Sequence, residues 1–296
     1  MNDHNALSRR AALVGLTLLA ACSRPSEPGA APSAAPSAKV SRSVTIKGSD
    51  TMVILGQRWA EAYGASHPGA SVQITGGGSG TGIAALTNGA TDVCQSSRPM
   101  KPEEKAKVKA ARNADAVETP VALDALAVYV HASNPIASLT LTQLAKIYVG
   151  ETKKWSDLGG SDAPIILYGR ENNSGTYGYF KEHVLANKDF ASAVQTLAGT
   201  AAVASAVGSD KAGIGYGGIA YLAGVRAVPV RKDDASTPVA PSRETALDGS
   251  YPLARSLFFY TAGAPTGEAA SFVAWVKGPE GQKVIDDVGY FPVPKR

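Results

Sequence analysis

The segment Ile74-Thr75-Gly76-Gly77-Gly78-Ser79-Gly80-Thr81-Gly82-Ile83 is an apolar run that passes into glycines interleaved with hydroxyl side chains. Glycine lets the backbone approach a ligand closely, so that successive N–H groups can point into one concavity. A helix that starts here adds its positive N-terminal end, and Ser79 and Thr81 add hydroxyl donors. The segment therefore predicts an anion-binding loop, with a flexible surface loop as the alternative interpretation.

Two nucleotide-binding motifs do not fit this segment. A P-loop has a lysine directly after its last glycine, whereas Gly82 is followed by Ile83. A dinucleotide-binding loop has the pattern Gly-x-Gly-x-x-Gly, and no register of residues 76–83 matches it. We therefore expect the loop to hold an anion without holding a nucleotide.

Strand-like and helix-like stretches alternate along the chain, which indicates an α/β fold. A strand over 43–47 leads into Gly-Ser-Asp-Thr at 48–51 and then a helix over 52–65. A second strand over 71–75 leads into the glycine-rich loop, and a third ends in Ser-Ser-Arg-Pro-Met at 96–100. Because ligands bind at the carboxyl ends of strands in an open parallel sheet, the three polar loops predict one site.

A second lobe is predicted from the middle of the chain. After a helix over 101–112, the apolar run 121–130, interrupted only by Asp124, is long enough to cross from one lobe to another. A strand over 164–168 precedes Arg170, whose planar fork suits tetrahedral oxyanions, and Ser174 is placed to cap the next helix. The apolar residues 257–260 carry the chain back. We predict one lobe from 43–130 with 251–296, a second from 131–250, and a cleft between them.

The N-terminus has the pattern of an export signal. Arg9 and Arg10 precede a short apolar stretch over 11–21, which is too short to span a bilayer, and Cys22 follows directly. We predict a lipoprotein signal peptide over 1–21, with the mature protein held outside the cytoplasm by lipid on Cys22. The pattern leaves both the Sec and the twin-arginine routes open. Residues 22–42, rich in proline, alanine and serine, are predicted to form a tether.

Composition narrows the functional classes. The chain has 296 residues and a net charge of +4, and removal of residues 1–21 takes away two arginines and one aspartate to leave +3. This charge is too small and scattered to indicate nucleic-acid binding. Cys94 is left without a partner and is expected to be a small buried side chain. The histidines have no metal-ligand spacing, so no metal or cofactor is expected; they are His4, His67, His131 and His183.

Several motifs together resemble the phosphate-binding proteins that serve bacterial phosphate ABC transporters, which have the type II periplasmic-binding-protein fold. The likeness covers about residues 43–296 and rests on four segments in order: Gly48-Ser49-Asp50-Thr51, Gly77-Gly78-Ser79-Gly80-Thr81-Gly82, Ser96-Ser97-Arg98-Pro99, and Arg170 followed by Ser174-Gly175-Thr176. The resemblance implies a monomeric binder of inorganic phosphate whose partner is the permease of an ABC importer.

The resemblance also implies the ligand donors. Thr51 and Ser79 would come from the first lobe, and Arg170, Ser174, the Gly175 amide and Thr176 from the second. Ser97 stands where the best-known members have an aspartate that accepts the phosphate proton. Two neighbours of these donors are candidates as well: Ser49 precedes the first loop's threonine, and Arg98 either donates to the ligand or braces its loop. Asp50 is our candidate to replace the missing proton acceptor, with a helix N-cap as its alternative role.

Other functions remain alternatives. An enzyme would need a nucleophile such as Ser79 or Ser174, but neither lies in Gly-x-Ser-x-Gly, so we predict that the protein is not an enzyme. A binder of another tetrahedral oxyanion, such as sulfate or molybdate, fits the same donors. A surface lipoprotein that senses phosphate without transporting it also fits.

Overall fold

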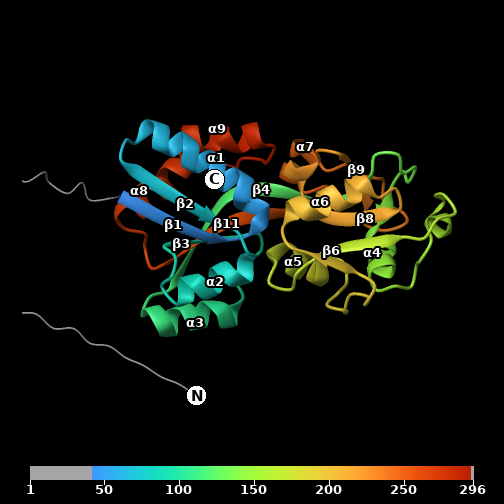
Figure 1. The fold of residues 1–296 in the computed structure, drawn as a ribbon, viewed down its shortest axis with the longest axis horizontal. Coiled ribbons are helices and arrows are strands. Elements are labelled where there is room, and N and C mark those ends of the chain that lie inside the picture. Colours follow the sequence, from blue (N-terminus) through green and yellow to red (C-terminus); the bar gives the residue numbers. More distant parts are fainter. Residues whose placement is uncertain (1–41, 295–296) are drawn as a thin grey trace, which may run out of the picture. The chain divides into compact units, whose positions relative to one another are not determined.

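The structure is a computed structural model that describes residues 42–294. Within these residues, nine strands form one sheet in the order β2, β1, β3, β11, β4, β8, β6 and β7, with β9 paired to β4 (Figure 1). The strands are β1 (Arg42–Gly48), β2 (Ala70–Thr75), β3 (Val93–Ser96), β4 (Ala116–His131), β6 (Ile166–Arg170), β7 (Gln195–Leu197), β8 (Gly213–Gly218), β9 (Val225–Val228) and β11 (Ala254–Ala262). Two short strands, β5 (Leu139–Thr140) and β10 (Val230–Arg231), pair with each other.

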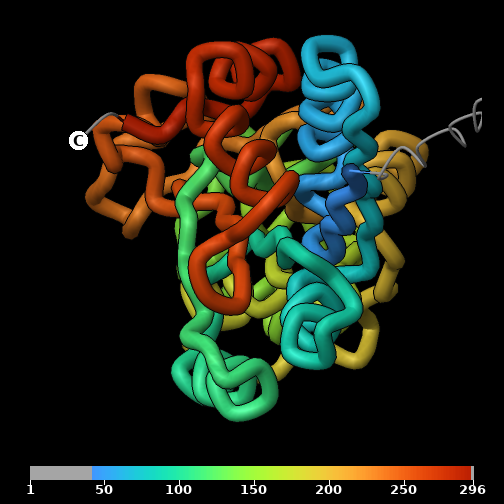
Figure 2. Tube along the Cα trace, turned by 90° about the vertical axis from the view of Figure 1, so that its left-hand side faces the viewer, coloured from blue at the N-terminus to red at the C-terminus, as the bar shows by residue number. Residues whose placement is uncertain are grey.

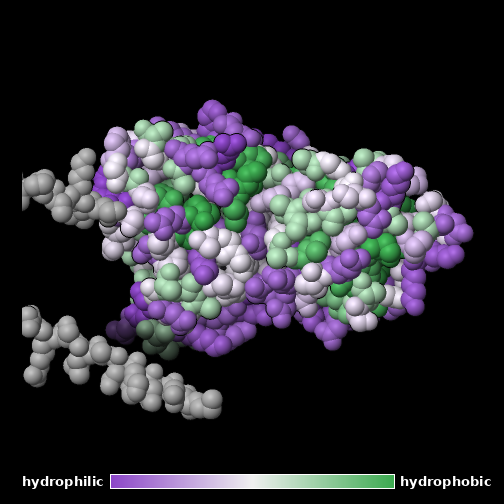
Figure 3. Space-filling view, in the orientation of Figure 1, coloured by the Kyte–Doolittle hydropathy of each residue, from purple (hydrophilic) through white to green (hydrophobic). Residues whose placement is uncertain are grey.

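The predicted signal peptide, Cys22 and most of the predicted tether lie outside the described residues. Strand β1 begins at Arg42, so it includes the last residue assigned to the tether. No helix within residues 42–294 is both long enough and apolar enough to cross a membrane. On the face drawn in Figure 3, hydrophobic residues form small patches separated by hydrophilic ones.

The first lobe packs helices on both faces of its part of the sheet. Helices α1 (Val53–Ser66), α8 (Gly267–Lys277) and α9 (Pro279–Val288) lie on one side, and α2 (Ser79–Thr87) and α3 (Pro102–Arg112) on the other (Figures 1 and 2). Side chains of β11 alternate between the two cores, as expected for a strand covered on both faces. Leu257 and Phe259 join the core under α1, and Phe258 and Tyr260 join the core under α2. Cys94 is fully buried in the second of these cores.

The second lobe follows the same plan. Helices α4 (Leu141–Tyr148) and α5 (Gly175–His183) cover one face, α6 (Thr200–Ser209) covers the other, and α7 (Arg243–Leu247) lies near β4. Val128 and Val130 of β4 point into the first of these cores, and Ala127 and Tyr129 point into the second. The two cores are therefore separated by the sheet, as in the first lobe.

Two strands connect the lobes. Strand β4 pairs with β11 as far as Ala125 and then with β8 from Leu126, so it passes from the first lobe into the second. Strand β11 runs antiparallel to it and returns the chain to the first lobe. The predicted α/β fold with two lobes and two crossings is therefore confirmed. The change of partner falls ahead of the predicted boundary at residue 130.

One local prediction was wrong, and one helix was missed. The strand expected over 164–168 is Ile166–Arg170, so Arg170 ends a strand instead of lying in the following loop. Helix α9 was not predicted, because Gly278 and Pro279 resemble the end of the chain's last helix. In the structure, Pro279 is instead the first residue of a new helix, a position where its missing N–H costs nothing.

Candidate functional site

Five buried hydroxyl side chains meet where the two lobes face each other, and we call them the hydroxyl cluster: Thr51, Ser79 and Ser97 from the first lobe, and Thr176 and Thr200 from the second. Oγ1 of Thr51 lies 2.8 Å from Oγ1 of Thr176 and 3.4 Å from Oγ1 of Thr200. Oγ of Ser97 lies 3.5 Å from both Ser79 Oγ and Thr176 Oγ1. The structure therefore joins four predicted ligand residues with Thr200, which the sequence did not indicate.

The ends of secondary structure elements supply these hydroxyls. Thr51 lies in a 3-10 turn (Asp50–Met52) after β1, and Ser97 directly follows β3. Ser79, Thr176 and Thr200 lie in the first turns of α2, α5 and α6. The N-terminal ends of three helices thus meet at one point, where their unpaired amides and dipoles favour negative charge.

The glycine-rich segment forms a further contact between the lobes at this site. Gly78 has φ +88°, a conformation that suits glycine, and an added Cβ would lie 2.6 Å from the carbonyl oxygen of Asn173. The Gly80 amide donates to that carbonyl over 2.9 Å, and the Gly77 amide donates to Asp50 over 2.8 Å. Two amides of the predicted anion loop are therefore engaged by protein acceptors, while its Ser79 hydroxyl joins the cluster.

Arg170 brings a buried cation to the cluster, and its side chain is 1% exposed. Nη1 donates to Thr200 Oγ1 over 2.8 Å, and Nη2 donates to Asp50 Oδ2 over 2.7 Å across the two lobes. Nε is buried and has no partner among the described residues. An unpartnered buried N–H is costly, so this atom indicates a place for an acceptor.

Asp50 does not cap helix α1, whose N-cap residue is Met52. Its Oδ1 instead accepts from Gly77 N, and its Oδ2 accepts from Arg170. The carboxylate therefore ties its own loop to the glycine-rich segment and to the second lobe. A carboxylate has about four acceptor positions, so these two bonds leave room for a ligand proton.

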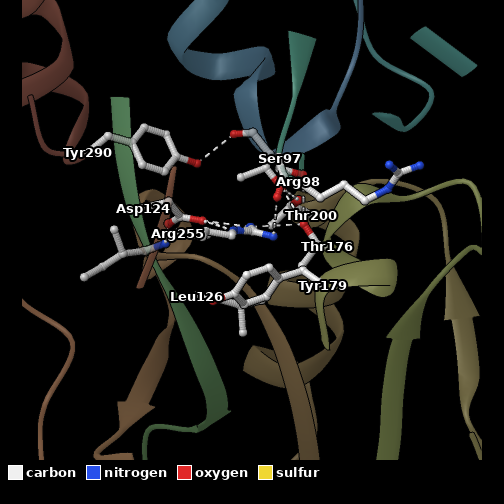
Figure 4. A network of polar contacts seen from close by, with 12 residues as sticks. Ser97, Arg98, Asp124, Leu126, Thr176, Tyr179, Thr200, Arg255 and Tyr290 are labelled. Atoms are coloured by element: carbon white, nitrogen blue, oxygen red, sulfur yellow. Dashed lines mark hydrogen bonds and ion pairs between the residues drawn. The ribbon is translucent and has the colours of Figure 1, made fainter. Parts of the chain in front are cut away.

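A second buried cation was missed. Arg255 on β11 pairs with Asp124 on β4 at 2.7 Å, and it also donates to Thr176 Oγ1 over 3.1 Å (Figure 4). Both side chains are almost fully buried. The sequence carried one signal for this pair: Asp124 interrupts an apolar run, and a charge buried in a strand needs a partner.

The chain is similar to known proteins over most of its length. A family model described as a PBP superfamily domain matches residues 33–280. The phosphate-binding protein PstS of Pseudomonas aeruginosa is 36% identical over 284 residues, which cover 90% of this chain and 88% of that protein. The chain belongs to the PstS family.

The PstS family likeness extends to a second relative and to a solved structure. PstS of Bacillus subtilis is 30% identical over 281 residues, which cover 94% of this chain and 90% of that protein. A phosphate ABC transporter substrate-binding protein from Clostridium perfringens, solved with bound phosphate, matches with a TM-score of 0.77 and 30% identity. That match covers 85% of this chain and all of the other chain.

The remaining PstS-like motif residues lie at the start of α5. Ser174 caps this helix as predicted, since its Oγ accepts from the Tyr177 amide over 3.3 Å. Gly175 packs against the cluster so closely that an added Cβ would meet Ser79 Oγ and lie 2.7 Å from Ser97 Oγ. A glycine is needed here because any larger residue would displace these two hydroxyls.

Arg98 and Ser49 do not join the cluster by their side chains. Both Nη atoms of Arg98 donate to Glu104, at 2.8 and 2.7 Å, and Figure 4 shows its guanidinium pointing away from the cluster. Burial alone would lower the pKa of Arg98, but the hydrogen-bonded Glu104 raises it overall. Arg98 therefore braces its loop by pairing with Glu104 of helix α3. Ser49 is buried and makes no side-chain capping bond, while its carbonyl accepts from Gln95 Nε2.

Buried tyrosines hold the backbone of the site. The hydroxyl of Tyr290 donates to the Thr51 carbonyl over 2.7 Å, and Tyr129 donates to the Gly218 carbonyl. Burial, reinforced by Asp124, raises the pKa of both phenols well above the ordinary value, so both stay protonated donors.

Among residues 42–294, no three His, Cys, Asp or Glu side chains are grouped to hold a metal ion.

Proposed function

We propose that this chain binds inorganic phosphate between its two lobes and delivers it to an ABC importer. The observation that carries the proposal is the meeting of five buried hydroxyls with the buried guanidinium of Arg170, whose Nε has no partner among the described residues. Hydroxyl and guanidinium donors match the acceptor oxygens of a tetrahedral oxyanion. The names of the PstS relatives and the bound phosphate in the Clostridium perfringens protein support phosphate as that oxyanion.

The proposed donors come from both lobes. Thr51, Ser79 and Ser97 would donate from the first lobe, and Arg170, Thr176, the Gly175 amide and the free hydroxyl hydrogen of Ser174 from the second. In the structure the cluster hydroxyls contact one another across the lobes, so an oxyanion would replace contacts such as Thr51 to Thr176. At about 1.5 to 3 kcal/mol for each bond to a charged group, these donors together exceed the ~8 kcal/mol of a micromolar site, and the excess offsets desolvation of the ligand.

The role in transport is binding without catalysis. PstS-family members named among the relatives are substrate-binding proteins of transport systems, which supports this assignment. We further propose that the mature chain acts outside the cytoplasm as a monomer, anchored by lipid on Cys22. The export pattern of residues 1–21 supports the anchor.

One observation favours a second candidate ligand. The carboxylates nearest the cluster, Asp50 and Asp124, already accept bonds from Arg170 and Arg255. A site in which both carboxylates are held by arginines suits an oxyanion without a proton, such as sulfate or molybdate, as well as it suits phosphate. Phosphate near neutral pH still carries a proton that needs an acceptor.

Titration calorimetry of the full-length chain with phosphate, arsenate, sulfate and molybdate separates these candidates. We expect phosphate to bind at micromolar or lower concentration and sulfate to bind far more weakly. Equal affinity for sulfate and phosphate would replace the phosphate assignment with a general oxyanion binder. Heat changes at the level of buffer dilution for every oxyanion would refute the proposed site itself.

A further inference from the structure

The buried ion pair of Arg255 and Asp124 lies on the two strands that connect the lobes. The two residues are directly opposite each other in the antiparallel register of β11 and β4. Nε and Nη2 of Arg255 both donate to Asp124 Oδ2, at 2.9 and 2.7 Å. The pair is adjacent to Ala125, after which β4 pairs with the second lobe, so the crossing strands themselves set its position.

From this position, the pair contacts both lobes. Nη1 of Arg255 donates to the Ser97 carbonyl of the first lobe over 3.1 Å, and Nη2 donates to Thr176 Oγ1 of the second lobe over 3.1 Å (Figure 4). The guanidinium carbon lies 5.3 Å from the centre of the Tyr179 ring, within the range of a cation–π contact. Asp124 Oδ1 accepts from the Ile219 amide over 3.0 Å.

The direction of the bond to Thr176 follows from the chemistry of the two groups. A guanidinium only donates hydrogen bonds, whereas a hydroxyl has one hydrogen and two acceptor positions. Thr176 Oγ1 must therefore accept from Arg255, and its own hydrogen points elsewhere. The other neighbours of this oxygen are hydroxyls of the cluster, Thr51 at 2.8 Å and Ser97 at 3.5 Å.

We propose that Arg255, held in place by Asp124, is a positioning residue that makes Thr176 a donor toward the bound oxyanion. This inference rests on the proposed function, because it assigns the orientation of one donor in that site. It assigns no ligand contact to Arg255. A planar fork with several donors suits this task, since it can hold Asp124, the Ser97 carbonyl and the Thr176 oxygen together.

Ser79 provides a matched comparison. It is as fully buried as Thr176 and is also a proposed donor, but its Oγ accepts from the Ser97 amide over 3.1 Å and has no hydrogen bond with Arg255. Loss of the ion pair should therefore remove the contribution of the Thr176 hydroxyl to phosphate affinity and leave the contribution of the Ser79 hydroxyl unchanged. General damage to the site would affect both hydroxyls equally.

Two double-mutant cycles test the inference by calorimetry of the full-length chain with phosphate. Asp124→Asn and Arg255→Gln together make one variant, which we call the neutral replacement. The first cycle combines the neutral replacement with Thr176→Val, and the second combines it with Ser79→Ala. The neutral replacement removes both charges at once, because a single change would leave an unpaired buried charge. Thermal unfolding of each variant verifies that it is folded.

We expect the neutral replacement and Thr176→Val each to weaken phosphate binding by about tenfold to a hundredfold. When the two are combined, phosphate affinity should be within about threefold of the affinity of the weaker-binding single partner. With Ser79→Ala, the losses should multiply. Losses that multiply in both cycles, or that fail to multiply in both, would overturn the inference.

If the neutral replacement does not fold, Arg255→Lys takes its place in both cycles. It keeps a charge opposite Asp124 but lacks the fork, so we expect the same coupling to Thr176 and none to Ser79. A wild-type chain that binds no phosphate would refute the proposed function and, with it, this inference. If the wild type binds phosphate normally but the coupling to Thr176 equals the coupling to Ser79, the inference alone is refuted.

Discussion

Replacement of Arg170 by alanine is the most direct test of the site. The side chain is 1% exposed and contacts Thr200 and Asp50, and its buried Nε has no partner among the described residues. Arg170→Ala removes every guanidinium donor at once. It also leaves the Asp50 carboxylate, which is 17% exposed, with the Gly77 amide as its remaining partner and with its charge beside the ligand position.

The size of the effect follows from the donors that are lost. A hydrogen bond to a charged group contributes about 1.5 to 3 kcal/mol, so the loss of two such bonds to the oxyanion costs about 3 to 6 kcal/mol. This corresponds to a decrease in phosphate affinity of roughly 10²- to 10⁴-fold. The stranded negative charge of Asp50 acts in the same direction. Arg170→Ala combined with Asp50→Asn should therefore recover part of the lost affinity.

Calorimetry of the full-length variants with phosphate measures this effect, and thermal unfolding verifies that each variant is folded. Arg226→Ala is the matched control, because it removes the same charge from the same lobe. Arg226 donates to the carbonyls of Asn134 and Ile136 and has no contact with the cluster. We expect the control to bind within about threefold of the wild type. Phosphate affinity in Arg170→Ala equal to that of the control would show that the site has been assigned wrongly.

Three further predictions concern the anchor, selectivity and the braced loop. Full-length protein should partition with membranes after native expression, and Cys22→Ala should release it or block its maturation; soluble, unlipidated wild-type protein would rule out the anchor. Asp50→Asn should narrow the phosphate-to-sulfate affinity ratio in competition calorimetry more than it lowers affinity overall, because an amide oxygen is a weaker, uncharged acceptor for the phosphate proton and the amide NH2 can donate to sulfate. An unchanged ratio would leave Asp50 with a structural role alone. Arg98→Gln should lower the melting temperature by a few degrees through loss of the pair with Glu104, with phosphate affinity within about threefold of wild type. A tenfold loss of affinity would return Arg98 to the ligand residues.

The sequence predicted the architecture because its signals are local. Alternation of strands and helices, polar loops after strands and a serine before a helix each involve a few neighbouring residues. Thr51, Ser79, Ser97 and Thr176 follow from such signals together with the family resemblance. The structure brings these four side chains into one buried cluster. The donor roles themselves remain predictions until ligand binding is measured.

The tertiary structure alone decided which charges meet. Arg255 and Asp124 are 131 positions apart, and Arg170 and Asp50 are 120 positions apart, so no local pattern links either pair. Thr200 has no motif, and it reaches the cluster because α6 begins there. A buried charge needs a partner, but the sequence does not say which one. That choice depends on the register of β4 with β11 and on how the two lobes pack together, and both arise only when the whole chain folds.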